Sequence, residues 1–186
     1  MPLSQEPNQL MAKTYLFNKP FGVLCQFSGE GLNLSDFISV KNIYPAGRLD
    51  KDSEGLLLLT DDGSLQHRIS HPKFDKVKTY VIQVEGQITN DAIAKLCQGV
   101  LLKDGMTKPA KVRKIDEPEW LWLREPPIRS RKNIPTSWIE MTIKEGKNRQ
   151  VRRMSAHVGF PTLRLIRTHI DQWNLQGLHS GEYKRI

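Results

Sequence analysis

Four consecutive leucines, residues 56–59, constrain the fold of this chain more than any other feature of its sequence. A fully apolar run this short is typical of a strand that is buried on both faces. The polar string GRLDKDSEG, residues 47–55, ends directly at this run. We therefore expect a buried strand with charged and turn-forming residues at its mouth.

Strand and helix patterns alternate along the rest of the chain, and no repeat of fixed period is present. Thr89 is the predicted N-cap of one helix, which ends at Gly99. Ser35 is the predicted cap of a short helix, and Asn148 is the predicted cap of a helix that ends at Gly159. This interspersed pattern favours an α+β (mixed α/β) sheet in one continuous domain. The periodicities predict helices over 64–70 and 91–98, and strands over 14–17, 23–27, 78–85, 120–123, 138–144 and 162–170.

Residues 1–12 are polar, contain Pro2 and Pro7, and are predicted to be a loose leader before a single domain over 13–186. No apolar run approaches the roughly 20 residues that span a bilayer, and the N-terminal residues lack a secretion signal. Cys25 and Cys97 are too few for a disulfide framework or a zinc site, which favours a reducing compartment. We therefore expect a cytoplasmic protein without a membrane association.

The charge of the chain is concentrated in one segment. The sequence has 28 Lys and Arg against 20 Asp and Glu, which gives a net charge of +8. Residues 129–167 contain ten bases and two acids, so the remaining 18 bases and 18 acids balance. Such clustering is expected of a protein that binds a phosphate backbone, although charge alone is equally compatible with a solvated basic face. The ten bases are Arg129, Arg131, Lys132, Lys144, Lys147, Arg149, Arg152, Arg153, Arg164 and Arg167.

Two strings have the composition of functional sites. In GRLDKDSEG, Asp50 lies near Arg48 at the mouth of a buried strand, an environment that prepares a carboxylate to act as a nucleophile or base. From spacing alone, an ordinary turn-rich loop remains the more common explanation. In EGKNRQVRRM, residues 145–154, a glycine turn enters a basic helix, and such N-termini favour anions. The charge count makes a merely solvated helix the weaker explanation there.

Four motifs occur in an order that resembles a known family. GRLDKDSEGLLLLTDDG (47–63) resembles the defining motif of pseudouridine synthases. NKPFGV (18–23), KTY (78–80) and EGKNRQVRRM are similar to the other motifs of that family. The last of these resembles the RsuA-like branch, whose members modify ribosomal RNA. The segment PPIRSRKNIPTSW (126–138) further resembles members that act on the large ribosomal subunit.

The resemblance implies a fold and a domain organisation. It implies the pseudouridine synthase fold, a central, mostly antiparallel sheet in two packed lobes flanked by helices and loops. Many relatives in this branch begin with a small RNA-binding module, for which the leader is too short. The domain itself is then expected to select the RNA, and the basic stretch 129–167 is the obvious candidate.

The resemblance also implies a reaction. In ribosomal RNA, with the 23S species favoured over 16S, the N1–C1′ bond of a uridine breaks, the uracil rotates, and C5 joins C1′. No redox change occurs, so neither a cofactor nor a metal is expected, and we expect a monomer. Asp50 matches the essential aspartate, which either attacks C1′ or deprotonates the ribose. Tyr80 matches the tyrosine that lies against the base, and Lys147 the basic residue that pairs with the aspartate.

RNA contacts follow as hypotheses from the same resemblance. A stacked uracil cannot rotate, so the nucleotide must be extruded. Arg48 is expected to fill the vacated space or to hold the flipped phosphate, and Gln150 to line the pocket. Two rival functions share these features: an inactive RNA-binding domain, and a glycosidase that cleaves the same bond and stops. The other predicted RNA contacts are Arg129, Arg131, Lys132, Arg149, Arg152 and Arg153.

Overall fold

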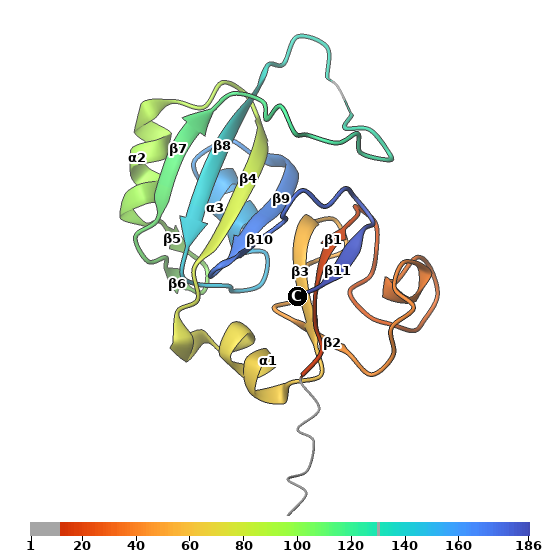
Figure 1. Ribbon diagram of the computed structural model, residues 1–186. Helices are drawn as coiled ribbons and strands as arrows, with labels where there is room; N and C mark the ends of the chain where they lie inside the picture. Colours follow the sequence, from red (N-terminus) through yellow and green to blue (C-terminus); the bar gives the residue numbers. More distant parts are fainter. Residues whose placement is uncertain (1–11, 130) are drawn as a thin grey trace, which may run out of the picture.

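The computed structural model describes residues 12–129 and 131–186. Within these residues one nine-stranded sheet runs through two lobes, with the order β11-β1-β3-β9-β4-β8-β7 (Figure 1). β2 pairs with β3 and β10 with β9 at its edges. The strands are β1 (Thr14–Lys19), β2 (Tyr44–Ala46), β3 (Glu54–Thr60), β4 (Lys78–Glu85), β7 (Lys111–Ile115), β8 (Thr136–Ile143), β9 (Thr162–Ile170), β10 (Trp173–Asn174) and β11 (Tyr183–Arg185).

Helices and short elements surround this sheet. The α-helices in the described part of the chain are α1 (Gly63–Ser70), α2 (Asn90–Gln98) and α3 (Gln150–His157). A small separate hairpin joins β5 (Leu101–Leu102) to β6 (Gly105–Met106), and 3-10 turns occupy Leu34–Asp36 and Pro72–Phe74. The mixed, mostly antiparallel sheet in two lobes confirms the predicted fold class.

The leucine run forms the centre of the first lobe. All four leucines of β3 are fully buried. Leu57 and Leu59 pack with Phe17 on one face, whereas Leu56 and Leu58 pack with Ile69 and neighbouring apolar residues on the other. Burial of both faces explains why β3 has no alternation of polar and apolar residues. The prediction of a buried strand is therefore confirmed.

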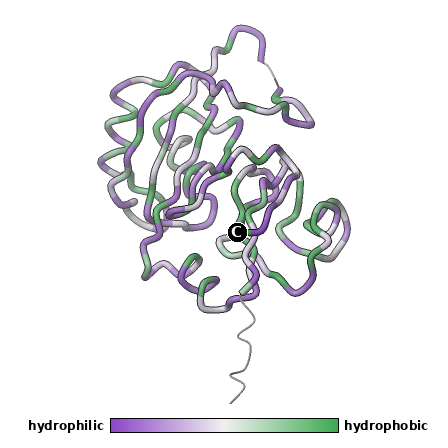
Figure 2. The backbone as a smooth tube through the Cα atoms, in the orientation of Figure 1, coloured by the Kyte–Doolittle hydropathy of each residue, from purple (hydrophilic) through white to green (hydrophobic). Residues whose placement is uncertain are grey.

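The second lobe has its own hydrophobic core. β4 and β8 contribute Ile82 and Ile139, while α2 and α3 contribute Leu96 and Met154. Hydrophobic segments accordingly run through the strands of both lobes (Figure 2). The predicted capping of α2 is confirmed, since the Thr89 side chain accepts a hydrogen bond from the amide of Ala92, and Gly99 ends the helix.

The two lobes join where β3 and β9 run parallel. This short ladder pairs Glu54 with Ile166 and Gly55 with Arg167, and every other ladder in the described sheet is antiparallel. Gly55 has a φ of +105°, and a Cβ there would overlap the backbone of Arg167. Only glycine lets the two backbones come this close. The loop 47–53 is therefore anchored at the seam between the lobes.

Several local predictions are wrong. Residues 23–27 form no strand beyond one bridge from Leu24 to Asn33, because the Leu24 amide bonds within a compact loop to Leu32. Residues 120–123 also form no strand: the Trp122 ring nitrogen bonds Glu54, while Leu123 is 93% exposed. Both segments have apolar composition, but neither pairs with another strand in a continuous ladder.

Two predicted helix caps are also displaced. Asn33, rather than Ser35, caps the 3-10 turn, in a capping box with Asp36. α3 begins at Gln150 after Arg149, and Asn148 does not cap it.

The remaining strand and helix predictions are confirmed, with small shifts at their ends. Residues 124–129 and 131–135 form neither helix nor strand. The predicted leader over 1–12 lies, apart from Ala12, outside the described residues. Among the residues that are described, no helix is long and apolar enough to cross a membrane.

Candidate active site

A cavity of about 320 Å³ lies where the loop 47–53 meets β4, β9 and the start of α3. Its volume is near the lower end for small-ligand pockets. The structure brings most of the predicted site residues to this one place, although they are distant in sequence. They are Arg48, Asp50, Tyr80, Lys147, Arg149, Gln150 and Arg152.

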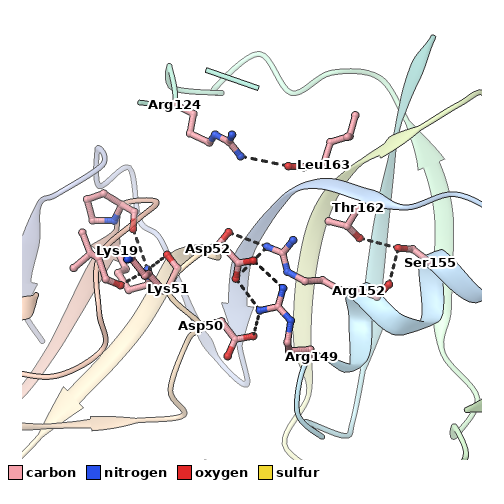
Figure 3. A network of polar contacts seen from close by, with 12 residues as sticks. Lys19, Asp50, Lys51, Asp52, Arg124, Arg149, Arg152, Ser155, Thr162 and Leu163 are labelled. Atoms are coloured by element: carbon pink, nitrogen blue, oxygen red, sulfur yellow. Dashed lines mark hydrogen bonds and ion pairs between the residues drawn. The ribbon is translucent and has the colours of Figure 1, made fainter. Parts of the chain in front are cut away.

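Asp50 shares a cation with a second acid. Arg149 Nη1 donates to Asp50 Oδ2 at 3.4 Å and to Asp52 Oδ1 at 3.0 Å, and Nη2 donates to Asp52 Oδ2 at 2.8 Å (Figure 3). The bidentate bond from Arg149 holds the pKa of Asp52 below its usual range. Asp52 thus fixes the guanidinium that contacts Asp50.

The backbone of Arg149 is set for this contact. Its φ of +52° and ψ of 30° lie in the left-handed region, immediately before α3. A side chain other than glycine or asparagine costs about 1 kcal/mol in that conformation. Such strain persists where the surrounding structure enforces it, often at functional sites.

The expected pairing of Lys147 with Asp50 is not found. Lys147 lines the cavity, but its Nζ donates to the carbonyl of Asp104 at 3.4 Å, in the turn between β5 and β6. The cation that contacts Asp50 is Arg149, two residues further along the same motif. The spacing of the motif did not distinguish these two positions.

Tyr80 reaches the cavity from the middle of the sheet. It lies on β4, where it pairs with Arg167 of β9 and Met141 of β8, and it is 8% exposed. Leu165 and Val151 also line the cavity. Tyr80 is therefore a largely buried aromatic residue in the wall of the cavity, with Leu165 and Val151 as apolar neighbours in that wall.

Cations hold the loop 47–53 by its carbonyl groups. Lys19, fully buried, donates through Nζ to the carbonyl of Lys51 at 3.3 Å and to that of Val23 at 2.9 Å. Arg167 Nη2 donates to the carbonyl of Gly47 at 2.6 Å, and Arg152 Nη2 to that of Asp52 at 2.8 Å. These bonds fix the loop backbone on both sides of Asp50.

A buried ion pair supports the seam beside this loop. Arg164 Nε and Nη2 donate to the carboxylate of Glu54 at 2.8 and 3.0 Å, and both side chains are at most 5% exposed. Trp122 Nε1 donates to the same carboxylate at 2.8 Å. Arg124 lies over the Phe21 ring, 4.1 Å from its centroid. These contacts tie the connection between β7 and β8 to the first lobe.

The basic stretch is less available than its charge count suggested. Arg164 and Arg167 are 5% and 2% exposed, so they are structural rather than surface cations. Arg153 forms a bidentate pair with Asp104, at 2.7 and 3.1 Å. The acids that pair with Arg153 and Arg164 are Asp104 and Glu54, which lie outside residues 129–167. A charge count within that stretch therefore does not include them.

The outer part of the predicted RNA surface lies apart from the cavity. Arg131 is 3.5 Å from Glu85, and with Arg129 it lines a separate hollow beside Leu163. Lys132 is exposed. Lys19, Asp52, Glu54 and Lys78 were not among the predicted site residues. The signal for Glu54 was a charge two residues before the leucine run. Within the described residues, no three His, Cys, Asp or Glu side chains are grouped to hold a metal.

The chain belongs to the RNA pseudouridylate synthase family, whose model matches residues 13–157. It is 54% identical over 176 residues to ribosomal large subunit pseudouridine synthase E of Vibrio vulnificus, covering 94% of this chain and 75% of the relative. The synthase of the same name from Xanthomonas campestris is 51% identical over 173 residues, covering 91% of this chain and 92% of the relative. The family resemblance of the motifs is thus confirmed.

A solved structure supports the same assignment. A crystal structure of a pseudouridylate synthase superposes with a TM-score of 0.78 at 31% identity, over 94% of this chain and 70% of the other.

Proposed function

We propose that this chain isomerises a uridine of large-subunit ribosomal RNA to pseudouridine, with Asp50 acting on the ribose. The observation that carries the proposal is the cavity itself, in which the Asp50 carboxylate lies with Tyr80 and with Arg149, its ion-pair partner. The relatives named above are synthases of the large ribosomal subunit. Ribosomal RNA as substrate also favours a cytoplasmic enzyme.

Each catalytic group has a distinct task in this proposal. The loop bonds from Lys19, Arg167 and Arg152 hold the Asp50 backbone, so the carboxylate meets C1′ or the ribose in a preorganised position. Tyr80 packs against the extruded uracil. Lys147 turns from the Asp104 carbonyl toward the RNA when the substrate binds. The enzyme acts as a monomer and without a cofactor.

Each predicted RNA-binding residue is given a part of the RNA according to whether it lines the cavity or lies outside it. Arg48 lines the cavity and is exposed, which suits the flipped nucleotide or its phosphate. Arg152 and Gln150 are less exposed and shape the wall. Arg153 lies further out along α3, and Arg129, Arg131 and Lys132 extend the surface for flanking phosphates.

Release of tritium from C5 tests the reaction. Large-subunit ribosomal RNA labelled at C5 of uridine should lose label to water with the wild-type protein, and Asp50→Asn should abolish that loss. Asp91→Asn, at an exposed acid of α2 outside the cavity, should leave the rate unchanged. Label release that survives Asp50→Asn would contradict the role of Asp50.

The two rival functions give different products. An inactive RNA-binding domain would bind the RNA and release no tritium. A glycosidase would liberate free uracil, which chromatography detects, whereas isomerisation leaves the mass of the RNA unchanged. Free uracil, or binding without label release, would therefore overturn the proposal.

A further inference from the structure

The proposed reaction creates a negative charge inside the cavity. When the N1–C1′ bond breaks, its electron pair leaves with the uracil, whether Asp50 attacks C1′ or removes a ribose proton. The detached uracil is then an anion, with charge on N1 and on the oxygens O2 and O4. A preorganised cation beside the base would stabilise the transition state that leads to this anion.

Lys78 lies beside the expected position of the base. Lys78 and Tyr80 are two residues apart on β4, so their side chains share a face of the strand, and both line the cavity. Among the described residues, the Lys78 ammonium forms no ion pair and no side-chain hydrogen bond, and only burial and Arg167 shift its pKa. Arg149, by contrast, is paired with Asp50 and Asp52.

The turn before α3 leaves room for this ammonium. A Cβ built on Gly146 would lie 2.7 Å from Lys78 Nζ, so the absence of a side chain at Gly146 accommodates the lysine. Gly146 is the glycine of the EGK turn and lines the same cavity. The position of the Lys78 ammonium is thus determined by two separate segments, β4 and this turn.

The surroundings of Lys78 are unfavourable to its charge until an anion arrives. Burial lowers the pKa of Lys78 to about 8, and the neighbouring positive charge of Arg167 acts in the same direction. The Arg167 guanidinium already donates to the carbonyls of Leu56 and Gly47, at 2.9 and 2.6 Å. Two nitrogens of Arg167 are therefore occupied by the backbone, whereas the Lys78 ammonium makes no hydrogen bond to the described residues.

The depth of Lys78 favours the base over a phosphate as its ligand. Arg48 and Arg149, at the mouth, are exposed, whereas Lys78 is partly buried and its neighbour Arg167 is only 2% exposed. An extruded nucleotide inserts its base first and keeps its phosphates near the strand from which it came. The exposed arginines therefore suit phosphates, and the deeper ammonium suits the uracil.

We propose that Lys78 donates a hydrogen bond to a carbonyl oxygen of the target uracil and stabilises the uracil anion while the base is detached. This role rests on the function proposed above. Lys78 keeps its proton throughout. The electron pair of the uracil anion forms the bond from C5 to C1′, while the Asp50–C1′ bond breaks or, in the elimination route, Asp50 returns the proton to the ribose. C5 then loses its proton to the medium, and N1 takes one up.

The first test compares Lys78→Met with Lys78→Arg. Lys78→Met removes the charge at similar volume, and should slow single-turnover conversion about 100-fold or more, as loss of a charge-stabilising donor does. The Kd for the RNA should change less than about twofold, because the contact forms chiefly in the transition state. Lys78→Arg should recover part of the rate. A raised Kd with an unchanged single-turnover rate would assign Lys78 to a phosphate and overturn the proposal.

The second test changes the leaving group. Fluorine at C5 withdraws electrons and stabilises the same anion, so RNA with 5-fluorouridine at the target should depend less on Lys78. The rate ratio of wild type to Lys78→Met should fall at least tenfold on this RNA, with disappearance of the target nucleoside followed on both substrates by nuclease digestion and chromatography. Disappearance is the common readout because the rearranged 5-fluorouracil has no C5 proton to lose. Equal ratios on the two RNAs would overturn the proposal. Because each ratio compares the same two proteins, a difference in the folded fraction cancels.

A neighbouring lysine provides the matched control. Lys76 pairs with Asp171 at 3.1 Å and does not line the cavity, so Lys76→Met should keep the wild-type rate on both RNAs. Failure of the wild-type protein to convert uridine would refute the proposed function itself. If the wild-type protein converts uridine and Lys78→Met converts it at the same rate, only the role of Lys78 is refuted.

Discussion

Two sets of cations in this molecule, one on strands and one on a helix, differ in the groups that they bond. The strand cations are Arg164 and Arg167 on β9, which are 5% and 2% exposed, and Lys78 on β4, which is partly buried and lines the cavity. The helix cations, Arg149, Arg152 and Arg153, lie at the start of α3. Arg164 and Arg167 bond a buried carboxylate and backbone carbonyls, whereas Arg149 and Arg153 bond acids in contact with solvent. Substitution of Arg164 or Arg167 should therefore reduce stability, whereas substitution of Arg149 or Arg153 should mainly affect turnover or RNA binding.

Arg164→Ala should show the largest effect on stability. It would leave the Glu54 carboxylate, 1% exposed, without its cation, and breaking a buried pair typically costs 3–5 kcal/mol, so we expect a loss of about 4 kcal/mol. Urea unfolding measures the loss. The double variant Glu54→Leu with Arg164→Met, which leaves no unpaired charge, should lose less than Arg164→Ala alone. A loss below about 1 kcal/mol for Arg164→Ala would remove the distinction between the two sets.

Because Lys78 is partly buried, its titration should make the free energy of unfolding depend on pH. Its pKa is about 8 in the folded protein against 10.5 for the ordinary side chain, so between these values the unfolded chain binds more protons. The free energy of unfolding contributed by Lys78 therefore rises with pH across this window. Lys78→Met lacks this contribution, so its stability relative to wild type should fall by about 1–3 kcal/mol between pH 8 and pH 10.5. Urea unfolding of both proteins across that range measures the difference, and a constant difference would place the ammonium in water.

Sequence and structure agree where a single physical cause dominates. The leucine run predicts β3 because apolar burial on both faces leaves few alternatives, and Thr89 predicts the start of α2 through a local hydrogen bond. The motifs also bring Asp50 and Tyr80 to one cavity. The strand over 120–123 failed because a ladder needs a partner strand, which composition does not specify.

The charge partners could not be predicted for a similar reason. Arg149 and Asp52 are separated by 97 residues, and Arg164 and Glu54 by 110, so no local spacing connects them. The sequence placed all ten bases of residues 129–167 in one potential RNA surface. The structure divides them, because β9 passes through the seam between the lobes and places Arg164 and Arg167 in the interior.

Arg149→Ala should separate activity from stability within the helix cations. Its side chain is 43% exposed, and exposed ion pairs contribute at most about 1 kcal/mol, so unfolding should change little. Turnover should fall by about tenfold or more, because Asp50 loses its ion-pair partner and the loop loses one of its links to the start of α3. Asp52→Asn, which removes the other anchor of Arg149, should reduce turnover less. A large loss of stability in Arg149→Ala, similar to that of Arg164→Ala, would contradict this separation.

The surface pair of Arg153 and Asp104 should give the smallest effect, in the dependence of RNA binding on salt. If Arg153 contacts a phosphate, Arg153→Ala should lower the slope of log K against log salt by about 0.7–0.9, the value for one phosphate contact. Asp104→Asn should strengthen binding a few-fold, because RNA no longer competes with the carboxylate that holds Arg153 at 2.7 Å. Opposite shifts from the two variants would show that Asp104 occupies Arg153 until RNA displaces it. Unchanged slopes for both variants would move the RNA path away from the outer turn of α3, toward Arg129 and Lys132.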